Sequence, residues 1–360
     1  MTRCRALRRP RAALVAALAL SAAALSAGCS TVGYYARSVG GHLQIVANAR
    51  PVAEWLADPH TPAPLKERLA LSQRIRDFAV TALGEPDNQS YRRYVDLKRP
   101  AAVWNVVAAP ELSLTLHTSC FLIVGCVGYR GYYDLASAEA FAAEQRAAGF
   151  ETSVYPVPAY STLGVLPFDW LADPLLSTFI GYPEGELARL IFHELAHQIA
   201  YAKGDTVFNE SFATTVERIG GERWLATHAS AQARTDHERQ EARRNDFREL
   251  TFRYRAALDV LYRSEAPDTD KRLRKSALFA AMRADHARLK QERWGGFSGY
   301  DDWFARANNA SLGVLAAYNE QVPAFMRLFD RVGGDFGRFY AEVRRLAALK
   351  PAERRAALDR

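Results

Sequence analysis

The chain has 360 residues, of which 49% are hydrophobic, a composition that supports a sizeable core and argues against global disorder. Its formal net charge is +7, but five of these positive charges belong to arginines within residues 1–28, where no acidic residue occurs. The rest of the chain is nearly neutral, so charge gives no case for a nucleic-acid partner.

Residues 1–28 have the layout of a bacterial lipoprotein signal peptide. A basic start is followed by an apolar run over 12–24, which is too short to span a membrane comfortably. The run leads into Leu-Ser-Ala-Gly before Cys29, which resembles a lipobox, and Cys29 would then carry the lipid. Ser30 stands where an Asp often marks inner-membrane retention, so we expect an outer-membrane lipoprotein facing the periplasm. The alternative is an ordinary signal peptide that happens to contain a cysteine.

Two cysteines would remain for the folded domain. Cys4 would leave with the signal peptide and Cys29 would be acylated, which leaves Cys120 and Cys126. Because the periplasm is oxidising, we expect these two to form a disulfide. Two small buried thiols are the alternative, whereas a thiolate zinc site is disfavoured because no nearby Cys or His would complete it.

The first predicted structural region, residues 29–100, is helical. Apolar residues recur at helical spacing between 40 and 83, and prolines at 59, 62 and 64 divide this stretch into two predicted helices.

Residues 101–156 change to a pattern of short strands separated by Pro110 and several glycines, with one helix over about 137–148. Residues 157–182 are rich in Pro, Gly and aromatic residues and predict an ordered loop. The expected strands are 102–108, 112–116, 121–124 and 152–155.

The chain after residue 183 predicts mostly helix. Residues 233–263 and 269–292 are dense in charged residues with an apolar stripe, which predicts an antiparallel helical hairpin. The expected fold class is α+β: mostly helical, with a small antiparallel sheet between helical layers. The two expected parts after the N-terminal region are a core over 101–221 and a C-terminal helical region over 222–360.

One motif carries the chemistry. The stretch 184–203 has no helix breaker before Gly204 and predicts a single helix. His193 and His197 are four residues apart, which puts both imidazoles on one face, where both can bind one ion. Glu194 is displaced around the helix, so it can reach a water molecule on the ion without being a ligand. This spacing predicts two zinc ligands and a general base, whereas a metal-free apolar helix with these residues would be costly to desolvate.

A third ligand is predicted on the next helix. Asn209 is a good N-cap, which places Glu210 in the first turn of a helix that ends near Gly220 and Gly221. The helix dipole at that end favours an ionised carboxylate, and the connection is long enough to bring Glu210 back level with the histidines. Glu217, two turns further on the same face, is the competing candidate for the third ligand.

These segments carry a family resemblance. His193-Glu-Leu-Ala-His197, followed by Asn209-Glu-Ser-Phe-Ala-Thr214, resembles the gluzincin metallopeptidases. More closely, it is similar to the bacterial family described as "putative aminopeptidases", a group of zinc-peptidase-like lipoproteins. The resemblance covers nearly the whole mature chain, through the further segments 129–133, 158–162, 308–310, Tyr318 and 322–325.

The resemblance implies a zincin-type helix beside the small sheet, with one zinc ion at His193, His197 and Glu210 and with Glu194 as the base. It implies a zinc peptidase and, by the family's description, an aminopeptidase. Two features depart from the pattern. Glu210 lies closer to His197 than its counterpart in well-known gluzincins, and no Gly-x-Met-Glu-Asn segment is present to hold a substrate's amine.

Three further expectations concern the reaction and its partners. Tyr318 and Tyr160 are candidates for stabilising the oxyanion, by resemblance and setting, and strand 112–116 or 152–156 could pair with an extended peptide. The expected partners are a peptide substrate and, through the lipid anchor, a membrane. The alternative functions are a non-catalytic envelope lipoprotein that keeps the metal for stability, as a scaffold or binding module, and a hydrolase of non-peptide amides. The presence of Glu194 favours catalysis, because a structural metal site has no need of a base.

Overall fold

The computed structural model describes residues 33–359 without 122–124 and 164–167. The side chains of residues 316–318 also lie outside this description. The predicted signal peptide and Cys29 fall outside the described residues, so the lipid anchor stays a prediction. In the described residues, no helix combines the length and the apolar character that crossing a membrane requires.

The N-terminal region contains three helical segments where the sequence predicted two. A helix over residues 33–47 is followed by α2 (Val52–Ala57) and α3 (Ala63–Thr81). The additional break arises because residues 50 and 51 form β1 (Arg50–Pro51), and a proline cannot donate the hydrogen bond that continues a helix. Pro62 is the N-cap of α3, which agrees with the predicted division by prolines.

An antiparallel sheet of three strands forms the centre of the β region. Its strands, in spatial order, are β6 (Arg130–Tyr132), β3 (Val103–Pro110) and β7 (Phe150–Val157). In the register, Asn105 of β3 is paired with Gly131 of β6 and with Tyr155 of β7. The predicted strands 102–108 and 152–155 are therefore confirmed, and β7 is a terminal strand of the sheet.

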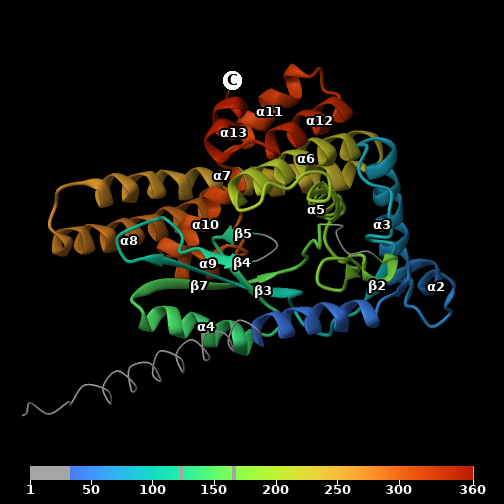
Figure 1. The fold of residues 1–360 in the computed structure, drawn as a ribbon, viewed down its shortest axis with the longest axis horizontal. Coiled ribbons are helices and arrows are strands. Elements are labelled where there is room, and N and C mark those ends of the chain that lie inside the picture. The colour runs from blue at the N-terminus through green and yellow to red at the C-terminus, as the bar shows by residue number, and fades with distance from the viewer. Residues whose placement is uncertain (1–32, 122–124, 164–167, 360) are drawn as a thin grey trace, which may run out of the picture.

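Helices cover both faces of this sheet. Side chains alternate between the two faces of a strand. Val106 packs in a cluster with residues of α4 (Leu135–Ala147), whereas Val107 packs with Ala310 of α10 (Asn309–Asn319). The sheet is therefore sandwiched between two helices, and the predicted helix at 137–148 is confirmed as α4 (Figure 1).

The remaining strands are short. β2 (Arg93–Val95) pairs antiparallel with β1 and parallel with β8 (Leu175–Leu176), which follows a 3-10 turn at Asp169–Leu171. β4 (Ser119–Phe121) pairs with β5 (Gly125–Val127), and a disulfide joins Cys120 to Cys126 across them.

The predicted strand at 112–116 is wrong. Its alternation of leucine with Ser and Thr is typical of a strand, but the segment is irregular and forms no strand, and the Ser113 hydroxyl accepts a hydrogen bond from the Thr115 N–H. Leu114 is buried in a separate hydrophobic cluster with residues of the helical hairpin. Tertiary packing thus overrides a local pattern that spans only five residues.

The second half of the chain is helical, as expected. The charged segment forms α7 (Ala231–Arg263) and α8 (Asp268–Glu292), which lie side by side as the predicted hairpin (Figure 1). The other helices are α5 (Glu184–Ala196), α6 (Thr206–Thr227), α9 (Asp301–Arg306), α11 (Val322–Arg331), α12 (Phe336–Ala347) and α13 (Pro351–Leu358).

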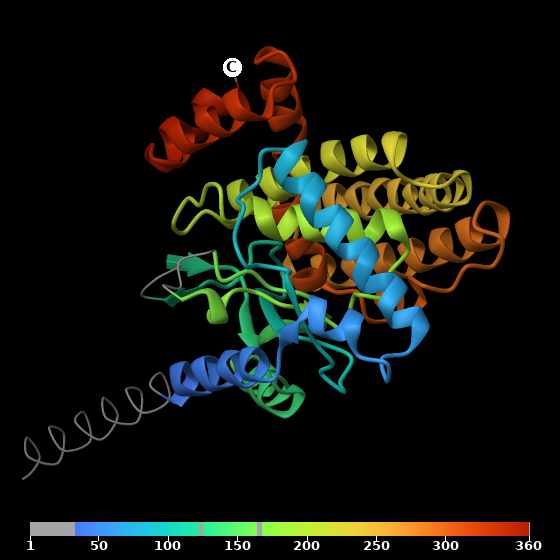
Figure 2. The ribbon, with the colours of Figure 1, turned by 90° about the vertical axis from the view of Figure 1, so that its right-hand side faces the viewer.

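The principal core joins distant parts of the chain. It combines buried residues of α3, α5 and α6 with those of α11, α12 and α13. The three C-terminal helices lie on the opposite side of α6 from the sheet, as both views show (Figures 1 and 2). The predicted division between residues 221 and 222 falls inside α6, so this helix belongs to both expected parts. The fold class is α+β and mostly helical, as predicted.

Candidate metal centre

α5 presents both histidines of the motif to one side. The helix ends at Ala196, and His197 is its C-cap, which keeps helical dihedral angles of φ −59° and ψ −21°. His193 and His197 therefore still lie on one face, as expected for residues four apart on a helix. Their two Nε2 atoms are 3.2 Å apart. The prediction that one helix runs from 184 to 203 is wrong, because the chain turns within 197–205.

A side chain of the next helix holds this turn. The Asn209 amide accepts a hydrogen bond from the Ala202 N–H at 2.8 Å and donates one to the Ala202 carbonyl at 2.9 Å. Asn209 is therefore not the N-cap that the sequence predicted. The N-cap of α6 is Asp205, whose carboxylate accepts from the Phe208 N–H, and Glu210 consequently lies in the second turn.

α6 continues through Gly220 and Gly221, where the sequence predicted its end. The two glycines allow close packing instead. A Cβ atom at Gly220 would lie 2.7 Å from a Leu83 side-chain carbon, and one at Gly221 would lie 2.6 Å from the Cγ atom of Arg189. α6 therefore approaches α5 closely, which brings its carboxylates to the histidines.

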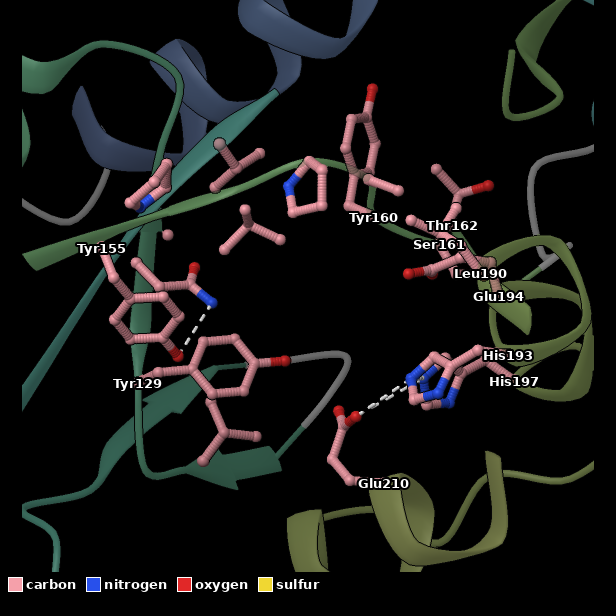
Figure 3. Close-up of a pocket in the computed structure, with 18 of the residues that line it drawn as sticks. Tyr129, Tyr155, Tyr160, Ser161, Thr162, Leu190, His193, Glu194, His197 and Glu210 are labelled. Atoms are coloured by element: carbon pink, nitrogen blue, oxygen red, sulfur yellow. Dashed lines mark hydrogen bonds and ion pairs between the residues drawn. The ribbon is translucent and has the colours of Figure 1, made fainter. Parts of the chain in front are cut away.

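Three ligand atoms converge between α5 and α6. The Glu210 Oε2 atom is 3.3 Å from His193 Nε2 and 3.8 Å from His197 Nε2. Figure 3 shows the Glu210 carboxylate directed at both rings, with dashed lines marking these contacts. All three side chains are largely buried, and one ligand atom from each lies within 4.8 Å of the others. The predicted set of His193, His197 and Glu210 is thus brought together.

Glu217, the competing third ligand, takes a different position. Its Oε2 atom accepts a hydrogen bond from His193 Nδ1 at 2.8 Å, on the far side of the ring from Glu210. Because a carboxylate only accepts, Nδ1 of His193 carries a proton, and Nε2 is the atom left to bind a metal. Such a carboxylate behind a histidine ligand fixes the orientation of the ring and raises its basicity.

Arg189 in turn holds Glu217. Its guanidinium donates to Glu217 Oε1 at 2.7 Å and to Glu241 Oε2 at 2.7 Å, and only 6% of its side chain is exposed. These neighbours raise the pKa of Arg189 in spite of its burial. The pKa of Glu217 is held well below its usual range, because Arg189 and His193 outweigh the effect of burial. Glu217 is therefore an ionised anchor for the histidine.

The ligands themselves respond to burial and to one another. Burial raises the pKa of Glu210, but His197 and His193 outweigh it and lower that pKa below its usual value. Burial lowers the pKa of His193, but its hydrogen bonds to Glu210 and Glu217 outweigh burial and raise that pKa well above its usual value. Burial lowers the pKa of His197 to about 4, so this ring is neutral with a lone pair available.

The donor set fits a metal ion. Two imidazoles and one carboxylate form the set found in catalytic zinc sites, which leave one coordination position open for water. A cation would take the place of the proton that otherwise lies between His193 Nε2 and Glu210. The fit rests on the convergence of these donors and on the anchoring of His193 by Glu217.

Glu194 is separate from the three ligands and faces a cavity. The cavity has a volume of about 1050 Å³ and is lined by the three ligands, by Glu194, by mostly apolar residues of β7 and the segment after it, and by the helix over 33–47. Burial raises the pKa of Glu194 to about 8, and a cation held by the neighbouring ligands would lower that pKa again, which favours the ionised form that a base requires. Its position beside the ligands, but outside the group of donors, is the one that the sequence predicted for a base.

The tyrosines are placed differently from expectation. The hydroxyl of Tyr160 is bonded to His42 Nδ1 at 2.8 Å and points away from the histidines in Figure 3. Tyr318 lies in α10, and its side chain is outside the described residues. Figure 3 shows instead the hydroxyl of Tyr129 directed toward Glu210, and the negative charge of Glu210 contributes to raising the pKa of Tyr129, after burial. Tyr129 is not among the site residues predicted from the sequence, although it lies in one of the segments on which the family resemblance rests.

The chain matches the model of a known protein family. The model of the family described as "Putative aminopeptidase" matches residues 33–358, which is nearly the whole described chain. The match confirms the resemblance noted in the sequence. No curated protein and no solved structure matches this chain.

Proposed function

Because the chain belongs to the "Putative aminopeptidase" family, we propose that it is a zinc-dependent peptide hydrolase in which Glu194 acts as general base. The observation that carries the proposal is the convergence of His193, His197 and Glu210 beside Glu194 at the wall of one large cavity. A site kept only for stability would have no need of a base or of an open cavity at the ion.

Each residue of the proposed site has a separate role in the reaction. A zinc ion held by the three ligands would lower the pKa of a water molecule and polarise the peptide carbonyl. Glu194 would accept the proton of the water and deliver it to the leaving amine. Glu217 and Arg189 would keep the His193 ring in place throughout.

β7 and the segment after it are the proposed guides for the peptide. β7 is a terminal strand of its sheet, and Tyr155, Pro156 and Val157 line the cavity. An extended peptide could therefore pair along this edge toward the metal centre. The predicted alternative at 112–116 is not available, since that segment forms no strand.

The proposed location rests on the N-terminal sequence alone. We propose that residues 1–28 are removed, that Cys29 is acylated and that the enzyme acts on peptides at the periplasmic face of the outer membrane.

Metal analysis and a cleavage assay test the proposed function. We expect the purified mature chain to contain about one zinc ion, to cleave members of a peptide library, and to lose cleavage with a chelator and regain it with zinc. Peptides with free and blocked N-termini would distinguish an aminopeptidase from an endopeptidase. A bound metal without cleavage of any peptide would favour a non-catalytic scaffold, and cleavage that a chelator leaves intact would refute the metal mechanism.

Tyr129 is the proposed donor to the developing oxyanion. Replacing Tyr129 with Phe removes only the hydroxyl, and we expect kcat to fall roughly 10- to 100-fold with a smaller change in KM. Tyr160→Phe is the matched comparison, because its hydroxyl is engaged by His42, and we expect a smaller fall in kcat. Steady-state kinetics of both variants would check this, and a larger loss in Tyr160→Phe would reverse the assignment.

A further inference from the structure

Four arginines line the cavity wall formed by α5, α6 and α7, namely Arg189, Arg218, Arg244 and Arg248. Glu241 accepts from Arg189 at 2.7 Å, from Arg244 at 3.0 Å and from Arg248 at 2.6 Å, so one carboxylate serves three guanidinium groups. Arg244 also pairs with Glu186 at 2.5 Å. These three arginines are thus all satisfied by carboxylates.

Arg218 differs from the other three. It lines the same cavity, yet its one hydrogen-bond partner among the described residues is the neutral Asn319 side chain, whose Oδ1 atom accepts at 2.8 Å. Its Nε atom is buried without any hydrogen-bond partner in the described structure. Burial and, next, the nearby Arg248 lower its pKa to about 10, so the guanidinium still carries its charge at neutral pH.

Apart from Glu194, each carboxylate that lines the described cavity is paired with a cationic side chain or belongs to the metal group. Glu217 is shared by Arg189 and His193, Glu186 is bound by Arg244, and Glu210 belongs to the metal group. Glu194 is the proposed base. The described wall therefore offers no spare carboxylate for a substrate's ammonium group, but it offers a spare guanidinium for an anion.

The position of Arg218 determines how far an anion bound to its guanidinium would lie from the peptide bond that is hydrolysed. Arg218 follows Glu217 directly and lies eight residues beyond Glu210 on α6, about 12 Å along the helix axis. An extended peptide covers about 3.3–3.6 Å per residue. The side chain of Arg218 itself spans part of the distance between the metal centre and the bound anion. A carboxylate within about three residues of the hydrolysed bond would reach the guanidinium.

We propose that Arg218 binds the C-terminal carboxylate of a short peptide, so that the enzyme acts on substrates whose C-terminus lies inside the cavity. The cleavage of a peptide bond in this inference rests on the proposed function. The binding of the carboxylate by Arg218 does not depend on it. It assigns the substrate class by its free C-terminus rather than by its free amine. An acidic side chain would offer the same carboxylate chemistry, and the experiment distinguishes the two sources.

Matched peptides test the proposal by activity. We expect the wild-type mature chain to cleave short peptides with a free C-terminus at least about tenfold more efficiently, by kcat/KM, than the same peptides with an amidated C-terminus. In Arg218→Gln the ratio should fall to near one, and in Arg218→Lys it should be partly retained. Arg253→Gln is the control for net charge, because Arg253 is exposed and pairs with Asp285 on the helical hairpin; its ratio should equal that of the wild type.

Binding to an inactive enzyme supplies a readout that does not depend on cleavage. In calorimetric titrations of Glu194→Gln with N-acetylated trialanine, we expect the free acid to bind at least about tenfold more tightly than the amide. The difference should disappear in Glu194→Gln combined with Arg218→Gln. An amidated peptide with a glutamate side chain that binds as tightly as the free acid would overturn the assignment to the C-terminus.

The two proposals can fail separately. Cleavage of both peptides with equal efficiency, or a preference that persists in Arg218→Gln, would overturn the role of Arg218 and leave the peptidase standing. Tighter binding of the free acid that depends on Arg218, without cleavage of any peptide, would support the carboxylate site and overturn the proposed peptidase.

Discussion

Replacing Glu194 with Gln is expected to lower kcat for peptide hydrolysis roughly 10²- to 10⁴-fold while the chain keeps its metal ion. Glutamine preserves the size of the side chain but cannot accept a proton from water at neutral pH. Since Glu194 lies outside the group formed by His193, His197 and Glu210, its replacement leaves every metal ligand in place. Kinetic assays combined with elemental analysis of the purified variant would measure both effects.

Two comparisons make this result specific. Glu210→Gln removes a charged ligand instead of the base, and we expect it to lose metal and activity together. Glu222→Gln, an exposed position on the same helix as Glu210, controls for the loss of one negative charge and should keep both. Full activity in Glu194→Gln would refute the proposed base, and loss of metal from that variant would show that Glu194 is itself a ligand.

The centre of the site was predictable because its spacing is local. A separation of four residues places His193 and His197 on one helical face whatever the rest of the chain does. The return of Glu210 to the same level followed from the length of the connection. The boundaries were predicted less well, because Asn209 bonds to the backbone of Ala202 instead of capping its own helix, a contact that depends on the tertiary turn.

The support behind the ligands could not be predicted from spacing. The sequence predicted Glu210 as the third ligand and left Glu217, on the same helical face, as the weaker candidate without any role of its own. The choice between them depends on Arg189, which approaches from another helix and binds Glu217 behind the His193 ring. Gly221 gives Arg189 the room to do so, although in the sequence this glycine indicated the end of a helix.

Contacts between residues that are far apart in the sequence also could not be predicted from local sequence patterns. Tyr129 directly precedes β6, more than sixty residues before the motif, and only the fold of the sheet brings its hydroxyl toward Glu210. The unmatched charge of Arg218 emerges only after the partners of the neighbouring arginines are known. Sequence spacing thus identifies the reacting groups, whereas the structure identifies the groups that orient them and face the substrate.

Replacing Arg189 with Met is expected to lower the free energy of unfolding by about 3–5 kcal/mol. Methionine retains most of the apolar packing, but it leaves the buried Glu217 with His193 as its one remaining partner in the described structure, whereas Glu241 keeps Arg244 and Arg248. An uncompensated buried carboxylate is more costly than the ion pair is favourable, so the loss exceeds that for an exposed pair. Urea unfolding of the metal-free chain would measure it.

The same substitution is expected to weaken metal binding about 10- to 100-fold, because Glu217 would no longer be held against the His193 ring. Arg253→Met is the matched control: it breaks an ion pair that is exposed on the arginine side, and we expect it to cost less than about 1 kcal/mol and leave metal affinity unchanged. Competition with a chromophoric chelator would compare the affinities. If Arg189→Met lost stability but bound zinc as tightly as the wild type, Arg189 would support only the fold, and the orientation of His193 would have to depend on Glu217 alone.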